Sequence, residues 1–265
     1  MGQGLSDQIE VRPADGSRWL WLAMPAAALC AWELAARLGL VSVLFFPAPS
    51  MIARTFCRLV VSGELPANTG IMLLRLLSGF VLGAVPGLCL GLLMGWLRPL
   101  RRLLDPVVAA FHPAPKMALL PIFMIILGLG EAPKLAIIAL GAFFPMLISS
   151  MAGVRQIKPI YFEVAANYNA SPLRVFTHVV VPGSLPLILA GVRLGFNSAL
   201  HIVVAVELLT ARRGLGAMIW FAWETMRTEE LYAAVAVTVF LGVAFNALLK
   251  RTMPRLVPWQ VELRV

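Results

Sequence analysis

Six polar residues stand inside long apolar segments of this 265-residue chain, where polar and charged side chains are costly. They are His112, Lys116, Arg193, Asn197, His201 and Glu207. Histidine, lysine and arginine suit contact with an anionic solute, and a histidine with a glutamate suits proton transfer across a membrane. Each also has a structural explanation, a hydrogen bond between helices or to a carbonyl freed by a helix break. The sequence leaves both interpretations open.

No enzymatic signature accompanies these residues. A P-loop needs Gly directly before its Lys, but the four lysines follow Pro, Pro, Ile and Leu. The histidines do not form His-Glu-x-x-His, and no serine lies in Gly-x-Ser-x-Gly. The three cysteines show no paired spacing, which predicts neither a disulfide framework nor a metal site. We therefore expect a non-catalytic chain without a cofactor or metal of its own.

Composition places these residues in a membrane protein. The chain is 60% hydrophobic and 13% charged, with a mean hydropathy of +0.86 and a net charge of +9. In such a protein a basic excess reflects the bias of Lys and Arg toward the cytoplasmic side more simply than it reflects nucleic-acid binding. The polar start has no signal-peptide order, so the first apolar segment is expected to stay as an anchor.

Six apolar stretches are long enough to cross a bilayer as helices. They are 19–38, 69–97, 104–127, 135–151, 185–209 and 231–249. Residues 50–61 and 211–230 are expected to form interfacial helices. Pro113, Pro115 and Pro121 must break regular helix in the third stretch. The predicted fold class is an all-α integral membrane protein, with tails at 1–17 and 256–265 and a transmembrane domain at 18–255.

A run of glycines marks one face of the second stretch. The residues Gly79, Gly83, Gly87, Gly91 and Gly95 recur every four positions and so share one side of a helix. Such a face lets two helices pack backbone to backbone. We expect this face to serve tight packing of the helix bundle. The alternative is that the helix contact it forms moves during transport. Pro86 interrupts the run and is expected to bend the helix.

A mixed polar segment, 163–182, lies between the fourth and fifth stretches. Pro159 is placed to start a short helix before it, and Pro172 forces a break within it. Glu163, Ala166 and Ala170 would share one face of that helix, and small residues leave this face little bulk. The segment is either an ordinary loop with a helix in it or a surface that another protein approaches closely.

This segment resembles the coupling loop of ABC-importer permease subunits, in which Glu-Ala-Ala is followed at fixed distances by Gly and by an aliphatic residue before Leu-Pro. Glu163, Ala165 and Pro182 match, whereas Asn169 stands in place of Gly. Asn tolerates left-handed backbone better than most residues do. The resemblance implies that the ATPase-contacting residues are Glu163, Ala165, Ala166, Asn169, Ala170 and Ser171.

The resemblance extends from about residue 43 to 259. It includes PAPS, LGLGEAPK, GAFFP and GLGAMIWFAWETMRTEELY, and it is to importers of nitrate, sulfonates, taurine and related solutes. It implies a type I importer bundle with six spans and a cytoplasmic coupling helix. The implied partners are a second permease copy, two ATPase subunits that hold ATP and Mg²⁺, an external solute-binding protein and membrane lipid, but no nucleic acid. The solute itself is left open.

Charge predicts the orientation. Assigning both tails, the turn at 98–102 and the loop at 152–184 to one side places most Lys and Arg there. That side is expected to be cytoplasmic, with both termini inside a bacterial inner membrane.

Two other classes remain as alternatives. A secondary transporter would need an intramembrane proton site, for which His201 and Glu207 are the plausible pair. A membrane enzyme is disfavoured because its known signatures are missing.

Overall fold

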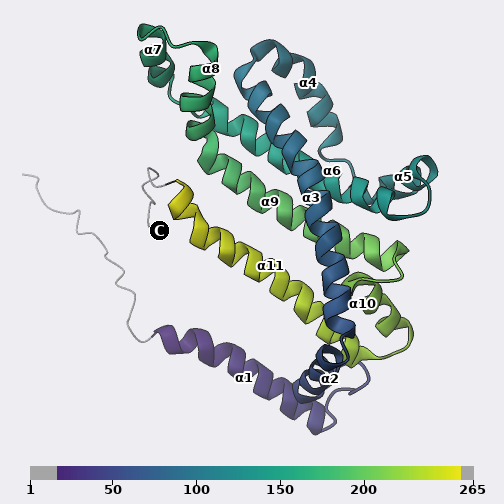
Figure 1. Ribbon diagram of the computed structural model, residues 1–265. Helices are drawn as coiled ribbons and strands as arrows, with labels where there is room; N and C mark the ends of the chain where they lie inside the picture. Colours follow the sequence, from purple (N-terminus) through teal and green to yellow (C-terminus); the bar gives the residue numbers. More distant parts are fainter. Residues whose placement is uncertain (1–16, 258–265) are drawn as a thin grey trace, which may run out of the picture.

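The computed structural model describes residues 17–257, so nearly all of both predicted tails lies outside it. Every regular element in this range is helical (Figure 1). The principal helices are α1 (Ser17–Arg37), α2 (Pro49–Val61), α3 (Glu64–Trp96), α4 (Arg98–Phe111), α5 (Leu120–Leu127), α6 (Glu131–Arg155), α7 (Pro159–Asn167), α8 (Pro172–Val175), α9 (Val181–Thr210), α10 (Leu215–Glu224) and α11 (Thr228–Leu256). A short 3₁₀ helix, η1 (Lys116–Leu119), precedes α5, and a π-helical turn, η2 (Phe176–Val180), joins α8 to α9.

Four helical segments within the described residues are long and apolar enough to cross a membrane. They are α3, α6, α11 and the continuous segment Pro172–Thr210 that includes α9. A fifth crossing results if α4 and the η1–α5 segment, which meet at a bend of 90°, are counted as one broken span. The multi-pass membrane fold is therefore confirmed. Six crossings stay a prediction, because α1 does not meet these criteria within the described part of the chain.

Helices α3 and α6 pack with their backbones in contact. A Cβ atom added at Gly87 would lie 2.6 Å from the carbonyl oxygen of Phe143, and one added at Gly95 would lie 2.6 Å from the Cβ of Val154. At Gly83 the added atom would overlap the carbonyl of Ala139. The helices approach this closely only because the residues at these positions have no side chain. Helix α3 runs through Pro86 as one helix.

Helix α6 is enclosed on its other side by α9, so it forms the centre of the bundle (Figure 1). The contact again uses small residues: a Cβ at Gly191 would lie 2.7 Å from the Cβ of Ser149, and one at Gly153 would lie 2.9 Å from the Cβ of Ser184. Aromatic rings fill the wider gaps, with Phe196 of α9 stacked on Phe245 of α11. The two seams make α3, α6 and α9 one rigid layer.

The third apolar stretch is not a straight helix. Helix α4 ends at Phe111, and Pro113 and Pro115 follow before η1 begins. A proline has no N–H to donate and its ring clashes with the preceding turn, so two prolines this close end the helix. The predicted break is therefore present, but the chain also changes direction there by 90°.

Helices α1 and α2 are attached to the start of α11. Glu33 of α1 accepts hydrogen bonds from the amide and the hydroxyl of Ser50 (3.0 and 2.7 Å). Thr55 of α2 donates to Glu229, and Arg58 forms an ion pair with Glu230 at 3.1 Å. In Figure 1, α1 runs from this attachment toward the left, below α11.

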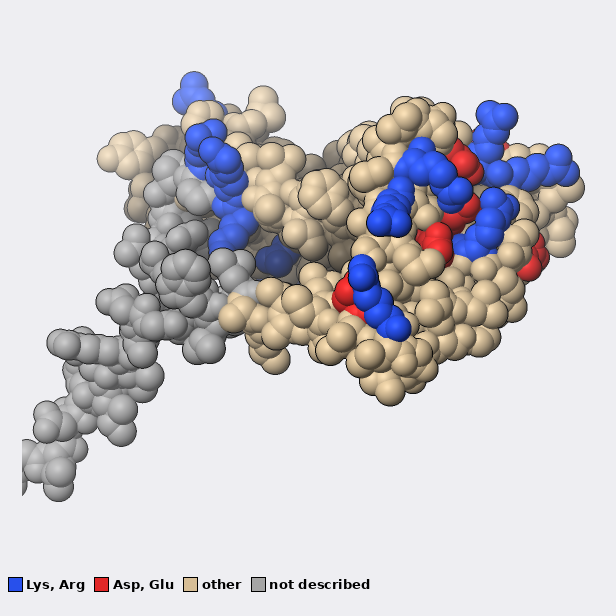
Figure 2. Space-filling view, turned by 90° about the horizontal axis from the view of Figure 1, so that it is seen from below, with Lys and Arg blue, Asp and Glu red and all other residues tan. Residues whose placement is uncertain are grey.

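The two ends of the bundle differ in charge. We call the end that carries α7 and α8 the α7 end, and the end that carries α5 and α10 the α10 end (Figure 1). Basic residues at the α7 end are Arg98, Arg101, Arg102, Arg155, Lys158, Arg174, Lys250, Arg251 and Arg255, whereas the acidic residues there are Asp105 and Glu163. At the α10 end, basic residues are interspersed with acidic ones, which are Glu33, Glu64, Glu131, Glu207, Glu224, Glu229 and Glu230. Figure 2 shows this mixture on its right-hand part, while the basic residues near the grey segment on the left have no acidic neighbour in view.

The α3–α6 seam makes a testable prediction. We expect Gly83→Ala to lower the free energy of unfolding by about 2 kcal/mol, because the added methyl group forces the two helices apart. The matched control is Gly70→Ala in the same helix, where nothing lies within 4 Å of the added atom. Thermal unfolding of both variants in the same detergent measures the difference. Equal midpoints would show that the seam tolerates added volume.

Candidate functional site

The α7–α8 loop projects from the α7 end of the bundle (Figure 1). Helix α7 begins at Pro159 with Lys158 as its N-cap and has no buried residue. Glu163 and Ala166 are exposed on it, while Ala165 is half-buried. The predicted shared face is wrong for Ala170, because the helix ends at Asn167 and Ala170 lies beyond it. Ser171 is the exposed N-cap of α8, which begins at Pro172.

The end of α7 explains why Asn169 suits its position. Asn169 has φ +49°, the left-handed conformation that Gly or Asn adopts at the end of many helices. Its N–H donates to the carbonyl of Ala166, and the N–H of Ala170 donates to that of Ala165, both at 2.9 Å. These two hydrogen bonds are the Schellman motif, which reverses the chain direction and satisfies carbonyls at the helix end. Asn169 therefore performs the role of a helix-ending glycine.

Large apolar side chains are exposed on this loop, which projects from one end of the bundle. Tyr168 is 84% exposed, Leu173 is 71% exposed, and Ile160, Tyr161 and Val164 are about half exposed or more. Beside them lie charged Glu163 and Arg174. Exposed apolar patches rimmed by polar residues are typical of protein–protein contact sites. We call these five apolar residues the loop patch.

The loop is anchored to the rigid layer at its base. The ring of Phe176 packs against Trp96 at the end of α3, with centroids 5.1 Å apart. Ile157 packs so closely on Gly183 that a Cβ there would lie 2.9 Å from its side chain. Between these contacts the chain forms the π-helical turn η2, a rare element that often occurs at functional sites. A displacement of α7 and α8 would therefore reach α3, α6 and α9 directly.

A polar face runs along the middle of α9. Arg193, Asn197 and His201 follow at intervals of four residues; Arg193 and His201 are exposed and Asn197 is half-buried. Asn246 of α11 joins them: it accepts a hydrogen bond from Arg193 (2.9 Å) and donates to Asn197 (3.2 Å). We call these four residues the α9 polar face. An arginine exposed in mid-span is too costly to face lipid, so this face requires water or protein opposite it.

His112 and Lys116 lie at the break between α4 and η1. The ammonium of Lys116 donates to the carbonyl of His112 (3.0 Å) and lies 5.6 Å from the ring centroid of Phe144. The imidazole of His112 also approaches this ring. Lys116 thus satisfies a carbonyl at the helix end, which is the structural explanation that the sequence left open. Within the described part of the chain, no hydrogen bond or ion pair joins these two residues to the α9 polar face.

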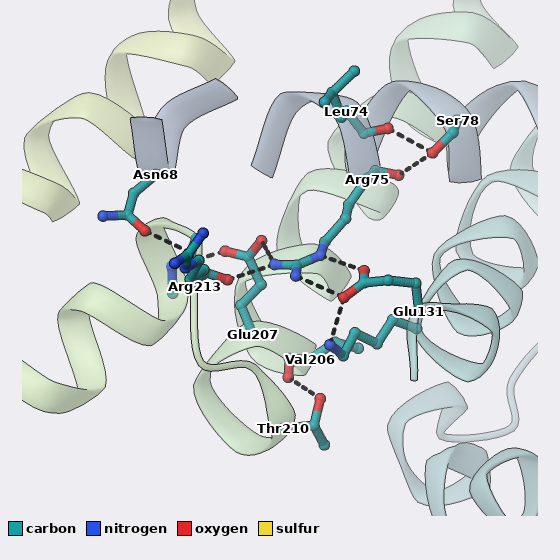
Figure 3. A network of polar contacts seen from close by, with 12 residues as sticks. Asn68, Leu74, Arg75, Ser78, Glu131, Val206, Glu207, Thr210 and Arg213 are labelled. Carbon is teal, nitrogen blue, oxygen red and sulfur yellow. Dashed lines mark hydrogen bonds and ion pairs between the residues drawn. The ribbon is translucent and has the colours of Figure 1, made fainter. Parts of the chain in front are cut away.

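A network of charges centred on Arg75 joins four segments at the α10 end (Figure 3). The guanidinium of Arg75 forms a two-pronged ion pair with Glu131 (2.6 and 2.8 Å) and a single one with Glu207 (2.7 Å). It also donates to the carbonyl of Arg213 (2.6 Å), and Lys134 donates to Glu131 (2.9 Å). Helices α3, α6 and α9 and the turn after α9 are thereby held together.

Glu207 is fully buried and holds the turn between α9 and α10. One carboxylate oxygen accepts from Arg75 and the other from the N–H of Gly216 (2.9 Å). Gly214 has φ +120° and its Cα faces the carboxylate so closely that a Cβ would overlap it. The N–H of Gly214 donates to Asn68 of α3 (2.8 Å). The structure thus places Glu207 in this network and apart from the polar partners of the α9 polar face.

Beside the network lies an open cavity of about 590 Å³. Its polar lining includes Arg75, Glu131, Lys134, Arg212 and Arg213, and its apolar lining includes Leu120, Met124 and Leu129. We call it the α10-end cavity.

Asn246, Glu131 and this cavity are not among the features expected from the sequence. Glu131 stands at the edge of an apolar stretch, where an acidic residue is unremarkable. Asn246 lies inside the last stretch, so its polarity within 231–249 was the signal that could have found it.

Comparison with known proteins identifies the family. The fold places the chain among all-helical, multi-pass membrane proteins, with a partly apolar loop that projects from one end of the bundle. Residues 87–261 match the family described as binding-protein-dependent transport system inner membrane component. The chain belongs to this family of ABC transporter permease subunits.

Named relatives cover most of the chain. A permease protein of Bacillus subtilis strain 168 named for aliphatic sulfonate transport, SsuC, is 33% identical over 90% of this chain and 87% of its own length. The taurine transport system permease protein TauC of Escherichia coli K12 is 31% identical over 90% and 89%. The nitrate import permease protein NrtB of Leptolyngbya laminosa is 29% identical over 69% and 66%. These relatives are non-catalytic membrane subunits, and none of them favours a secondary transporter.

The Arg75 network gives a prediction on stability. We expect Arg75→Ala to lower the free energy of unfolding by about 3–5 kcal/mol, because it leaves the buried Glu207 carboxylate without a cationic partner. Arg75→Lys should recover part of this loss, since an ammonium keeps the charge but not the two-pronged geometry. Arg54→Ala, at an exposed arginine of α2, is the control and should change stability by less than about 0.5 kcal/mol. If Arg75→Ala unfolds at the same temperature as Arg54→Ala, the network does not stabilise the fold.

Proposed function

We propose that this chain is the membrane-spanning subunit of an importer for a small anionic solute of the sulfonate, taurine or nitrate kind. In this proposal two copies form the pathway, two ATPase subunits bind the α7 end, and an external binding protein delivers solute to the α10 end. ATP and Mg²⁺ are held by the ATPase subunits. The family membership and the solutes for which the relatives are named support the anion class.

The observation that carries the proposal is the loop patch. Membrane lipid does not account for apolar side chains on a loop that projects beyond the bundle, whereas a partner protein does. The exposed charges of Glu163 and Arg174 would set the orientation of that partner, and the small residues Ala165, Ala166 and Ala170 would let it approach the backbone closely.

Charge distribution supports the orientation. The basic excess of the α7 end is the pattern expected on the cytoplasmic side of a bacterial inner membrane, and the mixed charges of the α10 end suit the outer side. With this orientation both termini are cytoplasmic, and the α7–α8 loop faces the compartment that supplies ATP.

The mechanism follows from the rigid layer. ATP binding draws the two ATPase subunits together and moves the α7–α8 loop that is docked on them. Because Phe176 and Ile157 tie this loop to the bundle, α3, α6 and α9 move as one body. Two such bodies rocking against each other open the path alternately to either side. Solute and nucleotide bias this equilibrium only through different affinities for its states.

The α9 polar face is our candidate for the solute path. Arg193, Asn197, His201 and Asn246 would offer hydrogen-bond donors to an anion, and His112 and Lys116 are further candidates at the broken third stretch. Glu207 is assigned to the Arg75 network instead, because both of its oxygens are bonded there. This bonding also argues against a proton-coupled pair of His201 and Glu207.

Coupling is tested at the loop. In membranes that contain the whole assembly, we expect Glu163→Arg or Ala166→Trp to reduce ATP-driven uptake by at least about tenfold. A charge reversal or a bulky ring at a packed contact costs more free energy than a tenfold change in affinity corresponds to. Asp105→Arg, at an exposed acidic residue of α4 outside the α7–α8 loop, is the matched control and should take up solute normally.

Membrane levels and co-purification of the ATPase subunit complete this test. The variants should reach the membrane at the level of the unmodified chain. Less ATPase subunit should co-purify with them in mild detergent. Normal uptake with normal ATPase recovery in both loop variants would refute the assignment of this loop to ATPase coupling.

The polar face is tested by removing single hydrogen-bonding groups. We expect Asn197→Ala and His201→Ala to raise the KM for uptake by about 3–10-fold, the ratio that one hydrogen bond contributes, without loss of assembly. Thr238→Ala is the control, because that hydroxyl bonds only to its own helix, at the carbonyl of Ala234. Unchanged kinetics in both polar variants would leave these residues with a structural role only.

A further inference from the structure

We propose that the α10-end cavity is a receiving site for a small organic anion, in which arginines hold the charged head and an apolar wall holds a short carbon chain. The inference rests on the proposed function, because it takes the α10 end as the side from which solute arrives. It adds a binding site on the permease itself, separate from the site of the external binding protein.

The charges that line the cavity are not balanced. Arg75 and Lys134 are almost fully buried, but both are already paired with Glu131, and Arg75 also with Glu207. Arg212 and Arg213 are exposed, and no carboxylate of the described residues lies within ion-pair distance of either guanidinium. The cavity therefore keeps two guanidinium groups without an anionic partner.

The turn that carries these arginines is held in place through its backbone. The backbone of Arg213 is fixed by the hydrogen bond from Arg75 to its carbonyl (2.6 Å), and the next residue, Gly214, donates to Asn68. The segment after the turn is fixed further by Glu207, which lies beside Arg213 (Figure 3) and accepts a hydrogen bond from the N–H of Gly216. A guanidinium on an ordered turn loses less conformational freedom when it binds an oxyanion, and its planar fork matches two oxygens of a carboxylate or sulfonate.

Part of the cavity lining is apolar. Leu120 and Met124 of α5, together with Leu129 just after this helix, line the cavity alongside the charged residues. A volume of about 590 Å³ is within the range of small-molecule sites and exceeds what an inorganic ion needs. The pairing of guanidinium groups with aliphatic side chains favours an oxyanion that carries a short alkyl group.

The test measures binding to the permease–ATPase complex without its binding protein, in nanodiscs of phosphatidylcholine. The probe is butane-1-sulfonate, followed by ligand-observed NMR. We expect saturable binding that is weaker for methanesulfonate, which lacks most of the apolar contact, and absent for butylammonium. The double variant Arg212→Ala, Arg213→Ala should weaken binding by at least about tenfold, because charge-assisted hydrogen bonds are lost. Arg54→Ala should bind like the unmodified complex.

The outcomes separate this site from the function on which it rests. ATP-driven uptake is measured with the same complex and its binding protein in proteoliposomes. If uptake proceeds there but butanesulfonate does not bind in nanodiscs, or binds the double variant equally well, the site is refuted and the importer function stands. If phosphatidylglycerol is retained by the complex and the sulfonate does not displace it, the cavity holds an anionic lipid and the proposal is also refuted. A complex that shows no ATP-driven uptake would overturn both.

Discussion

The structure depends on one buried guanidinium. Arg75 bonds two carboxylates and a backbone carbonyl from three other segments, so the ends of α3, α6 and α9 cannot separate there without exposing unpaired charge. The glycine seam fixes the same helices along their length, and the charge network fixes them at one end. Together these contacts hold the three helices as one body. Any mechanism in which a displacement at one end of the bundle opens a path at the other requires this.

Local features of this fold could be predicted from the sequence, and long-range ones could not. The prolines at 113 and 115 indicate a break, Pro159 indicates a helix start and Pro172 a second break, because proline acts through its own ring and missing N–H. The 90° turn at the first break is invisible in sequence, since it depends on what packs against η1 and α5. Likewise the four-residue spacing of glycines indicates a close contact, but it does not say that α6 is the partner.

The same limit applies to the functional residues. Arg193 and Asn197 attract attention because they are polar within an apolar stretch, yet their shared partner Asn246 comes from a helix about fifty residues later. Glu207 appeared to be a candidate for proton chemistry on the same ground, and only the three-dimensional arrangement shows Arg75 beside it. Polarity inside a span marks a residue that needs a partner, and the fold decides whether that partner is another side chain, water or a solute.

The loop patch has a consequence for biogenesis. A newly inserted chain presents Tyr168 and Leu173 to water until the proposed ATPase subunit covers them. Such an exposed apolar surface associates non-specifically and is recognised by chaperones and proteases. A permease made in excess of its partner would therefore be degraded or would aggregate. Cellular abundance of the assembly would then follow the scarcer subunit, and the ratio between chains would be corrected after synthesis, without regulation at the level of the genes.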